Sequence, residues 1–239
     1  MKTKNSILLY PLISVVISIY SCNKKDDFAI DYINLRPWII YGSMTDKDGN
    51  TYKTIPIGTQ TWMVQNLKTT KYNDGTSIPL VMDAGSWNNL STPGYCWQVN
   101  DLAYRVTYGL LYNWYTVNTG KLCPKGWHVP SDAEWTKLTD YLGGENIAGG
   151  KLKESGGSHW NSPNTGATNE SSFKAFPGGV RLNSADAPFD NLREMGCWWT
   201  TASGDDWAAS RLMFYDNDRV QKAFCPKNQG LSVRCVWDY

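Results

Sequence analysis

The fold is organised around the stretch Cys123-Pro124-Lys125-Gly126-Trp127-His128-Val129-Pro130-Ser131-Asp132-Ala133-Glu134-Trp135. Within it, Ser131 can accept a hydrogen bond from the backbone N–H of Glu134 while the Glu134 side chain reaches back to Ser131, which is a capping box. Apolar residues then recur at helical spacing from Trp135 up to a Gly143-Gly144 pair, which can adopt the left-handed conformation that ends a helix. The sequence therefore predicts a helix of about three turns with one apolar face.

The composition indicates a globular chain with one sizeable core. Of its 239 residues, 41% are hydrophobic and 13% are aromatic, which is enough apolar surface for one domain with a small extension. The formal net charge is +1 and the sequence has no polybasic run, so we expect no nucleic-acid partner. The 21 glycines and 11 prolines indicate short strands joined by many turns.

Residues 1–21 have the three-part pattern of a secretory signal peptide. Two lysines precede an apolar run over residues 7–20, which ends just before Cys22. This run is shorter than the roughly 20 residues that a permanent transmembrane helix needs. Because Ile19-Tyr20-Ser21-Cys22 resembles a bacterial lipobox, we expect Cys22 to be acylated with palmitate-type chains that anchor the mature protein in the outer membrane. The alternative is an ordinary signal peptide beside an incidental cysteine.

Residues 22–41 are predicted to link this anchor to the folded domain. The stretch Asn23-Lys24-Lys25-Asp26-Asp27 is wholly polar and should form a solvated tether. Its last three residues resemble the signal that exports lipoproteins of some Bacteroidetes to the outer face of the outer membrane. Residues 28–41 are too apolar for a free linker, so we expect them to pack on the domain.

Residues 42–239 are predicted to form one α+β domain. A hairpin is expected over residues 42–67, with a tight turn at Asp48-Gly49-Asn50, and a second short helix over residues 108–117. Residues 143–172 are polar and predict a long loop, of the kind that often carries a binding surface. Four consecutive antiparallel strands are expected at residues 197–201, 208–215, 219–224 and 232–237.

Several short segments follow one another in a particular order. They are Asp48-Gly49-Asn50-Thr51-Tyr52, Gln60-Thr61-Trp62-Met63, Asn66-Leu67, Tyr108-Gly109-Leu110-Leu111-Tyr112-Asn113-Trp114-Tyr115, Cys123-Pro124-Lys125-Gly126-Trp127-His128-Val129-Pro130, Pro177-Gly178-Gly179 and Ser232-Val233-Arg234-Cys235-Val236. In this order they resemble the Fibrobacter succinogenes major paralogous domain, a family of secreted and lipid-anchored bacterial proteins. The resemblance covers residues 42–239 and implies a C-type-lectin-like fold, in which two short helices flank small antiparallel sheets beside a long loop region. It implies no particular reaction.

The same fold belongs to relatives of formylglycine-generating enzymes, which residues 129–135 and 232–235 loosely echo. Those enzymes bind copper with two cysteines a few residues apart, whereas Cys225 and Cys235 lie ten positions apart. The catalytic match therefore fails. The calcium-binding motifs of sugar-binding C-type lectins do not occur in the sequence either, so we expect no cofactor and no metal site.

Five cysteines lie in the domain. In an oxidising envelope disulfides are expected, and the odd number leaves one thiol unpaired. We favour a bond between Cys123 and Cys235, which would tie the helix predicted after Ser131 to the last strand, and a second bond between Cys197 and Cys225 on neighbouring strands. Cys96 would then remain as a buried small apolar residue, although the sequence leaves the connectivity open.

The candidate ligand-binding residues are aromatic and acidic side chains in predicted loops: Trp87, Trp160, Trp207, Asp205 and Asp206. Exposed aromatic faces stack on sugar rings and are common in binding hot spots. For each tryptophan the alternative is packing in the core, and for the two aspartates it is a solvated turn. His128 is interpreted as structural, because neither histidine has the spacing of a metal site or a catalytic triad. No catalytic residue is assigned.

These observations favour a cell-surface lipoprotein whose domain is a binding or adhesion module for glycans or for another surface protein. One alternative is an enzyme, either a degraded relative of formylglycine-generating enzymes or a hydrolase that uses turn carboxylates. Another is a structural protein of the envelope. We expect a binding module rather than an enzyme.

Overall fold

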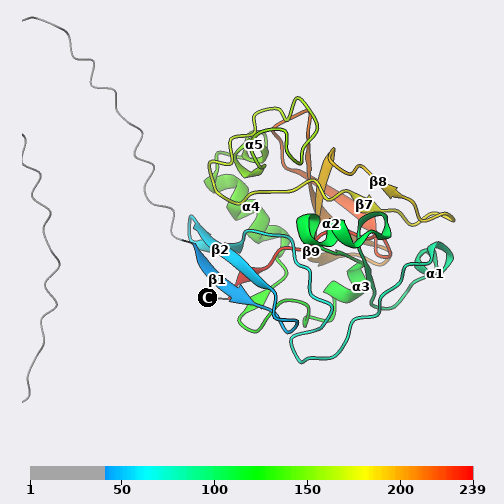
Figure 1. Cartoon of the computed structure of the whole chain (residues 1–239). Helices are drawn as coiled ribbons and strands as arrows, with labels where there is room; N and C mark the ends of the chain where they lie inside the picture. The colour runs from blue at the N-terminus through cyan, green and yellow to red at the C-terminus, as the bar shows by residue number, and fades with distance from the viewer. Residues whose placement is uncertain (1–40, 239) are drawn as a thin grey trace, which may run out of the picture. The chain divides into compact units, whose positions relative to one another are not determined.

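The computed structural model describes residues 41–238, which form an α+β domain with short helices and antiparallel sheets (Figure 1). The signal peptide, the lipidation of Cys22 and the packing of residues 28–40 are predictions that lie outside the described residues. The helices are α1 (Ala84–Asn88), α2 (Leu102–Tyr108), α3 (Trp114–Val117), α4 (Asp132–Tyr141) and α5 (Ala148–Leu152), with a 3₁₀ turn η1 (Gln98–Asn100). The strands are β1 (Gly42–Thr45), β2 (Thr51–Ile57), β3 (Gln60–Met63), β4 (Tyr95–Cys96), β5 (Leu111–Tyr112), β6 (Trp127–His128), β7 (Val180–Arg181), β8 (Phe189–Asp190), β9 (Met195–Ser203), β10 (Trp207–Phe214), β11 (Gln221–Pro226) and β12 (Val236–Trp237).

The strands form two main sheets. The larger one has the order β1-β2-β3-β12-β6, so β12 lies between the N-terminal hairpin and β6. The second sheet consists of β11, β10 and β9, and the strand pairs β4–β5 and β7–β8 stand apart from both. Figure 1 shows β1 and β2 side by side at the start of the described chain. Because β12 comes from the C-terminus, the beginning and the end of the domain are joined in one sheet.

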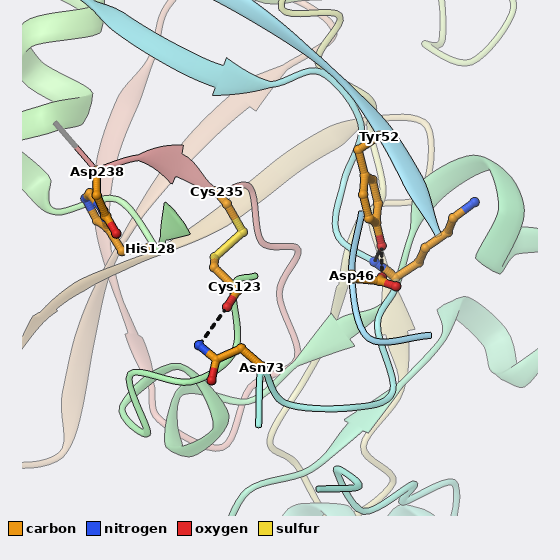
Figure 2. The surroundings of a disulfide bond; sticks show 8 residues. Asp46, Tyr52, Asn73, Cys123, His128, Cys235 and Asp238 are labelled. Carbon is orange, nitrogen blue, oxygen red and sulfur yellow. Dashed lines mark hydrogen bonds and ion pairs between the residues drawn. A yellow bond between two sulfur atoms is a disulfide. The ribbon is translucent and has the colours of Figure 1, made fainter. Parts of the chain in front are cut away.

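The N-terminal hairpin is confirmed, and Asp46 holds its turn. The Asp46 carboxylate accepts hydrogen bonds from the backbone N–H groups of Asp48 and Asn50, both at 2.9 Å. It also accepts the hydroxyl of Tyr52 at 2.6 Å (Figure 2). Gly49 has a φ of +82°, which glycine adopts without steric cost. The acidic side chain here therefore stabilises the turn itself.

The helix predicted after Ser131 is α4, and both halves of its capping box are present. Ser131 Oγ accepts the N–H of Glu134 at 3.2 Å, and Ser131 N–H donates to the Glu134 carboxylate at 2.8 Å. The helix packs between the two main sheets. The Trp135 ring centroid lies 5.1 Å from that of Trp62 in β3 and 6.0 Å from that of Trp198 in β9. All three indoles are fully buried, so this helix sets how the sheets pack.

The expected helix over residues 108–117 is wrong as a single element. The helix α2 ends at Tyr108 because Gly109 has a φ of +78°, and a Cβ there would lie 2.8 Å from atoms of Asn66 and Leu67. The strand β5 follows, and Asn113 then caps α3. Apart from one residue, every side chain from 109 to 117 is buried. An apolar run of this kind does not distinguish helix from strand by its periodicity.

Three of the four expected C-terminal strands are confirmed as β9, β10 and β11. The fourth, over residues 232–237, is reduced to β12. Ser232 forms a parallel bridge to Trp198 in β9, whereas Val236 pairs with residues of β3 and β6. Only the two residues of β12 form a regular strand here, because the segment crosses from one sheet to the other.

The Cys123–Cys235 disulfide is confirmed (Figure 2). The two Cα atoms are 6.0 Å apart, and the bond joins positions separated by 112 residues. The side chain of Asn73 donates to the carbonyl oxygen of Cys123 at 3.0 Å. The disulfide thus ties the segment before α4 to the residue that directly precedes the last strand, β12.

Arg234 is a buried cation for which the described residues provide no carboxylate partner. Its Nε donates to Asn66 Oδ1 at 3.0 Å and its Nη2 to the Lys174 carbonyl at 2.7 Å, while Nη1 donates to the carbonyl of Phe173. The guanidinium carbon lies 4.2 Å from the Phe173 ring centroid. Asn66 Oδ1 also accepts the indole N–H of Trp198 at 2.9 Å. Arg234 therefore joins chain segments that are distant in the sequence.

Candidate functional site

Trp87 and Trp160 are fully buried, which corrects the expectation that loops expose them. The Trp87 ring centroid is 4.7 Å from the guanidinium carbon of Arg181. Arg181 is itself buried and donates to the carbonyl oxygens of Val81 at 2.8 Å and Met82 at 2.7 Å. Trp87 therefore covers a buried cation that holds the loop before α1.

Trp160 packs against another buried cation, Lys153, whose Nζ lies 5.3 Å from the ring centroid. The ammonium donates to the carbonyl oxygens of Thr165 and Phe214, both at 2.9 Å, and of Asn217 at 2.7 Å. Burial lowers the pKa of Lys153 to about 8, so the group stays largely protonated at neutral pH and keeps its three donors. The long polar loop is folded around this cation and contains α5.

Trp207 is exposed and lies near a second exposed aromatic side chain. Trp207 opens β10 and Phe224 lies in β11, with 51% and 60% of their surfaces exposed. Phe224 pairs with Ala209 of β10. Side chains two positions apart in a strand share a face, so Ala209 and Trp207 point to the same side of β10. Phe224 and Trp207 therefore lie on one face of the sheet. We call Trp207 and Phe224 the aromatic platform. Among residues 41–238, no other two large exposed aromatic side chains share a sheet face in this way.

Phe224 is a residue that sequence reasoning missed. Its strand, β11, alternates exposed Lys222 and Phe224 with less exposed neighbours. The one sequence signal of this exposure is the charged Lys222 two positions before Phe224, because residues two apart in a strand share a face. The partner strand could not be aligned from sequence, because the register depends on the turn that joins β10 to β11. Without that register, nothing places Phe224 beside Trp207.

Charged groups border the aromatic platform. The Lys222 ammonium lies 5.5 Å from the Phe224 ring centroid and 2.7 Å from the carboxylate of Asp132. Asp205 and Asp206 are exposed in the turn just before Trp207. Their backbone carbonyl oxygens accept Lys227 Nζ at 2.7 Å and the Lys227 N–H at 3.3 Å, respectively. These bonds fix the turn through its main chain, and no residue of the described part of the chain is bonded to either carboxylate.

A polar cleft of about 370 Å³ lies elsewhere, between the N-terminal hairpin and the long loop. Its charged groups already have partners. Glu154 lies 3.3 Å from the ammonium of Lys174 and 2.5 Å from His159 Nδ1. Lys53 Nζ lies 5.0 Å from the ring centroid of Tyr41. Because an uncharged ligand would have to displace these contacts, the aromatic platform is the stronger candidate.

The expected Cys197–Cys225 disulfide is not formed, and both residues are free thiols. Cys197 lies in β9 and Cys225 in β11, with β10 between them. Strands two places apart in a sheet are separated by about 9.5 Å, which exceeds the roughly 7 Å that a disulfide can span between Cα atoms. Cys96 is buried, as expected, and burial raises the pKa of its thiol to about 12.

His128 is held between two carboxylates. Its Nδ1 is hydrogen bonded to the carboxylate of Asp238 (Figure 2), and its Nε2 lies 2.8 Å from Glu134 Oε1. Burial by itself lowers the pKa of His128, but the hydrogen bonds to Asp238 and Glu134 and their charges outweigh burial and raise it. The imidazolium therefore links the end of the chain to the first turn of α4.

The raised pKa of His128 makes part of the stability depend on pH. Because the folded-state pKa lies above the unfolded value of about 6.5, this contribution is fully present below that value and is lost as the pH rises through the folded-state pKa. We expect His128→Gln to lower the free energy of unfolding more at about pH 5.5 than at about pH 8.5, as measured by urea denaturation. An equal effect at both pH values would contradict this account.

Residues 55–237 match the Fibrobacter succinogenes major domain. The chain belongs to this family. No curated relative and no solved structure matches it. In the described part of this Fibrobacter succinogenes major domain protein, none of the helices has the length and apolar character needed to cross a bilayer.

The segments that carry the family resemblance build the core of the domain. Trp62 packs on α4, Asn66 and Arg234 form the buried hydrogen-bonded cluster, and Cys123 belongs to the disulfide. These side chains are all buried. Neither residue of the aromatic platform lies in such a segment. Membership of the family therefore accounts for the fold of this domain, but it does not identify a binding surface.

Proposed function

We propose that this protein is a binding module that holds glycans on the aromatic platform. We also propose that its α+β domain is C-type-lectin-like and that it is displayed on the cell surface by a lipid on Cys22, after removal of residues 1–21. The outer membrane would then be its membrane partner. The short helices and small antiparallel sheets support the assignment of the fold. The lipobox-like sequence supports the anchor.

The exposure of Trp207 and Phe224 on one face of β10 and β11 carries the proposal for function. Burying large aromatic rings is favourable, and a folded domain rarely leaves two of them together in water without a use. A pyranose ring offers one flat apolar face and a rim of hydroxyl groups. The aromatic platform would take the apolar face, and the carboxylates of Asp205 and Asp206 would accept hydroxyl groups at the rim.

A glycan and polysaccharide array tests this proposal. We expect the wild-type chain to bind a subset of glycans without added calcium. We expect Trp207→Ala and Phe224→Ala each to weaken the binding about tenfold, because each loses a stacking contact of about 1.4 kcal/mol. The matched control is Trp237→Ala, which removes an indole of similar exposure, 46%, from the other main sheet.

Equal binding by the wild type and both platform variants would contradict the proposal, as would loss of binding in Trp237→Ala alone. Absence of binding to any glycan would also count against it and would favour a protein ligand for the same exposed aromatic residues.

A further inference from the structure

The polar cleft between the N-terminal hairpin and the long loop is lined by two amide side chains whose orientation is fixed. Gln65 Oε1 accepts the backbone N–H of Lys53 at 2.8 Å, and Asn169 Oδ1 accepts the backbone N–H of Lys174 at 2.9 Å. A backbone N–H donates only to the oxygen of an amide group, so these bonds distinguish the oxygen from the nitrogen. Neither NH₂ group donates to any residue in the described part of the chain. Both are therefore available to a ligand.

Two lysine side chains line the same cleft and also keep donors available. Lys53 is exposed, and among residues 41–238 its ammonium contacts only the ring of Tyr41, which accepts no conventional hydrogen bond. The Lys174 side chain is 45% exposed, and its ammonium lies 3.3 Å from Glu154 Oε1. An ammonium has three donors, so Glu154 engages at most part of this group. An acceptor from solution can reach both ammonium groups.

Glu154 is the one acidic residue among the described residues that line the cleft, and it already has partners on both sides. Its Oε2 lies 2.5 Å from His159 Nδ1, and its Oε1 faces Lys174. The chain after it is held by Asn164, whose Nδ2 donates to the carbonyl oxygens of Glu154 at 2.9 Å and Gly156 at 2.8 Å. Glu154 is buried. It therefore positions Lys174 and does not act as a free acceptor.

The groups that remain available in the cleft are thus mainly donors. Two lysines and one glutamate give the lining a net positive charge at neutral pH. An anion can add to the available donors and leave the existing contacts in place. The volume of about 370 Å³ lies in the lower part of the range for small-molecule sites. It suits an anionic group that is attached to a body about the size of one sugar ring.

We propose that this cleft is a second binding site, which takes the carboxylate or phosphate group of a small organic anion. The anionic group would accept charge-assisted hydrogen bonds from Lys53 and Lys174, which are stronger than bonds between neutral groups. The NH₂ groups of Gln65 and Asn169 would donate to its remaining lone pairs. The inference does not depend on the aromatic platform, because no residue of the cleft belongs to it.

Isothermal titration calorimetry of the full chain with three sugars tests the proposal. Glucuronate carries a carboxylate, glucose 6-phosphate carries a phosphate on the same ring, and glucose has neither. We expect at least one of the two anions to bind with a Kd of about 1 mM. Glucose should bind at least about tenfold more weakly, because it offers no charged acceptor. The anion that binds more tightly identifies the group that the cleft takes.

The variants Gln65→Glu and Asn169→Asp locate the site. Each keeps the oxygen that accepts the backbone N–H, so the local fold should be retained, but each replaces the NH₂ donor by an oxygen and adds a negative charge. We expect each to weaken the binding of the anion by more than about tenfold. The matched control is Asn118→Asp, which adds the same charge at an exposed position that does not line the cleft. It should bind as the wild type does.

The comparison of the three sugars on the wild-type chain does not depend on how the variants fold. If neither anion binds more tightly than glucose, the proposal is overturned. Unchanged binding of the anion in both Gln65→Glu and Asn169→Asp would also overturn it, as would an equal loss in Asn118→Asp.

Discussion

Removal of the Cys123–Cys235 disulfide is expected to lower the free energy of unfolding by about 4–5 kcal/mol. The bond joins residues 112 positions apart, and a cross-link over so long a loop removes much of the entropy of the unfolded chain. Typical domains have only about 5–15 kcal/mol of stability, so the double variant Cys123→Ala with Cys235→Ala should be close to unfolding. Urea denaturation of the two proteins measures the difference.

The matched control is Cys225→Ser, which removes a half-buried free thiol and should change the stability little. Treatment of the wild type with a reducing agent should reproduce the effect of the double variant. If reduction leaves the unfolding midpoint unchanged, the disulfide contributes nothing and the prediction is wrong.

Substitution of Arg234 by methionine is expected to cost about 4 kcal/mol. Methionine can fill the space of the Arg234 side chain, but it leaves the carbonyl oxygens of Phe173 and Lys174 without the donor that they have now. Asn66 Oδ1 also loses one of its two donors and keeps only the indole N–H of Trp198. Each buried polar atom left unpaired costs about 1–3 kcal/mol. Thermal unfolding should show the loss as a fall in Tm of roughly 10 °C for a domain of this size.

Arg219→Met serves as the control for this variant, since Arg219 is exposed and its substitution should be nearly neutral. Arg234→Lys adds a further comparison, because a single ammonium cannot reproduce the planar set of guanidinium donors. Arg234→Met with wild-type stability would show that the buried cation does not hold the domain together.

The features that local sequence signals encode were predictable. The capping box of Ser131 and Glu134 lies within four residues, and it defines the start of α4. The turn around Gly49 is equally local. The Cys123–Cys235 bond is not local, because it joins positions separated by 112 residues; the sequence favoured this pair from the expected places of the two cysteines but left the connectivity open.

The buried tryptophans show why other features were not predictable. Trp87 is covered by Arg181, almost a hundred positions later in the sequence. Trp160 lies in a polar stretch, and its burial depends on Lys153 with carbonyl oxygens as partners. Main-chain carbonyl groups occur at every residue, so a cation bound by them leaves no pattern in the sequence. The expectation that Trp87 and Trp160 are exposed failed for this reason.

The candidate site was predictable only in part. Trp207 and the acidic turn before it are recognisable as a hairpin end. Phe224 depends on the register in which it faces Ala209, and register is a tertiary property that a single strand does not reveal. The Cys197–Cys225 error has a similar cause, because the order β11-β10-β9 inserts a strand between the two cysteines.

The most direct test of glycan binding on the aromatic platform is a titration followed through the indole N–H resonances of the tryptophans by NMR. The ¹⁵N-labelled chain would be titrated with soluble oligosaccharides of hexoses, N-acetylhexosamines and uronic acids. Trp207→Phe identifies the Trp207 resonance by its absence and keeps an aromatic ring at that position. We expect one of these saccharides to shift the Trp207 resonance while that of Trp237 stays in place. A shift confined to Trp237 or to other indoles, or no shift with any saccharide, would contradict it.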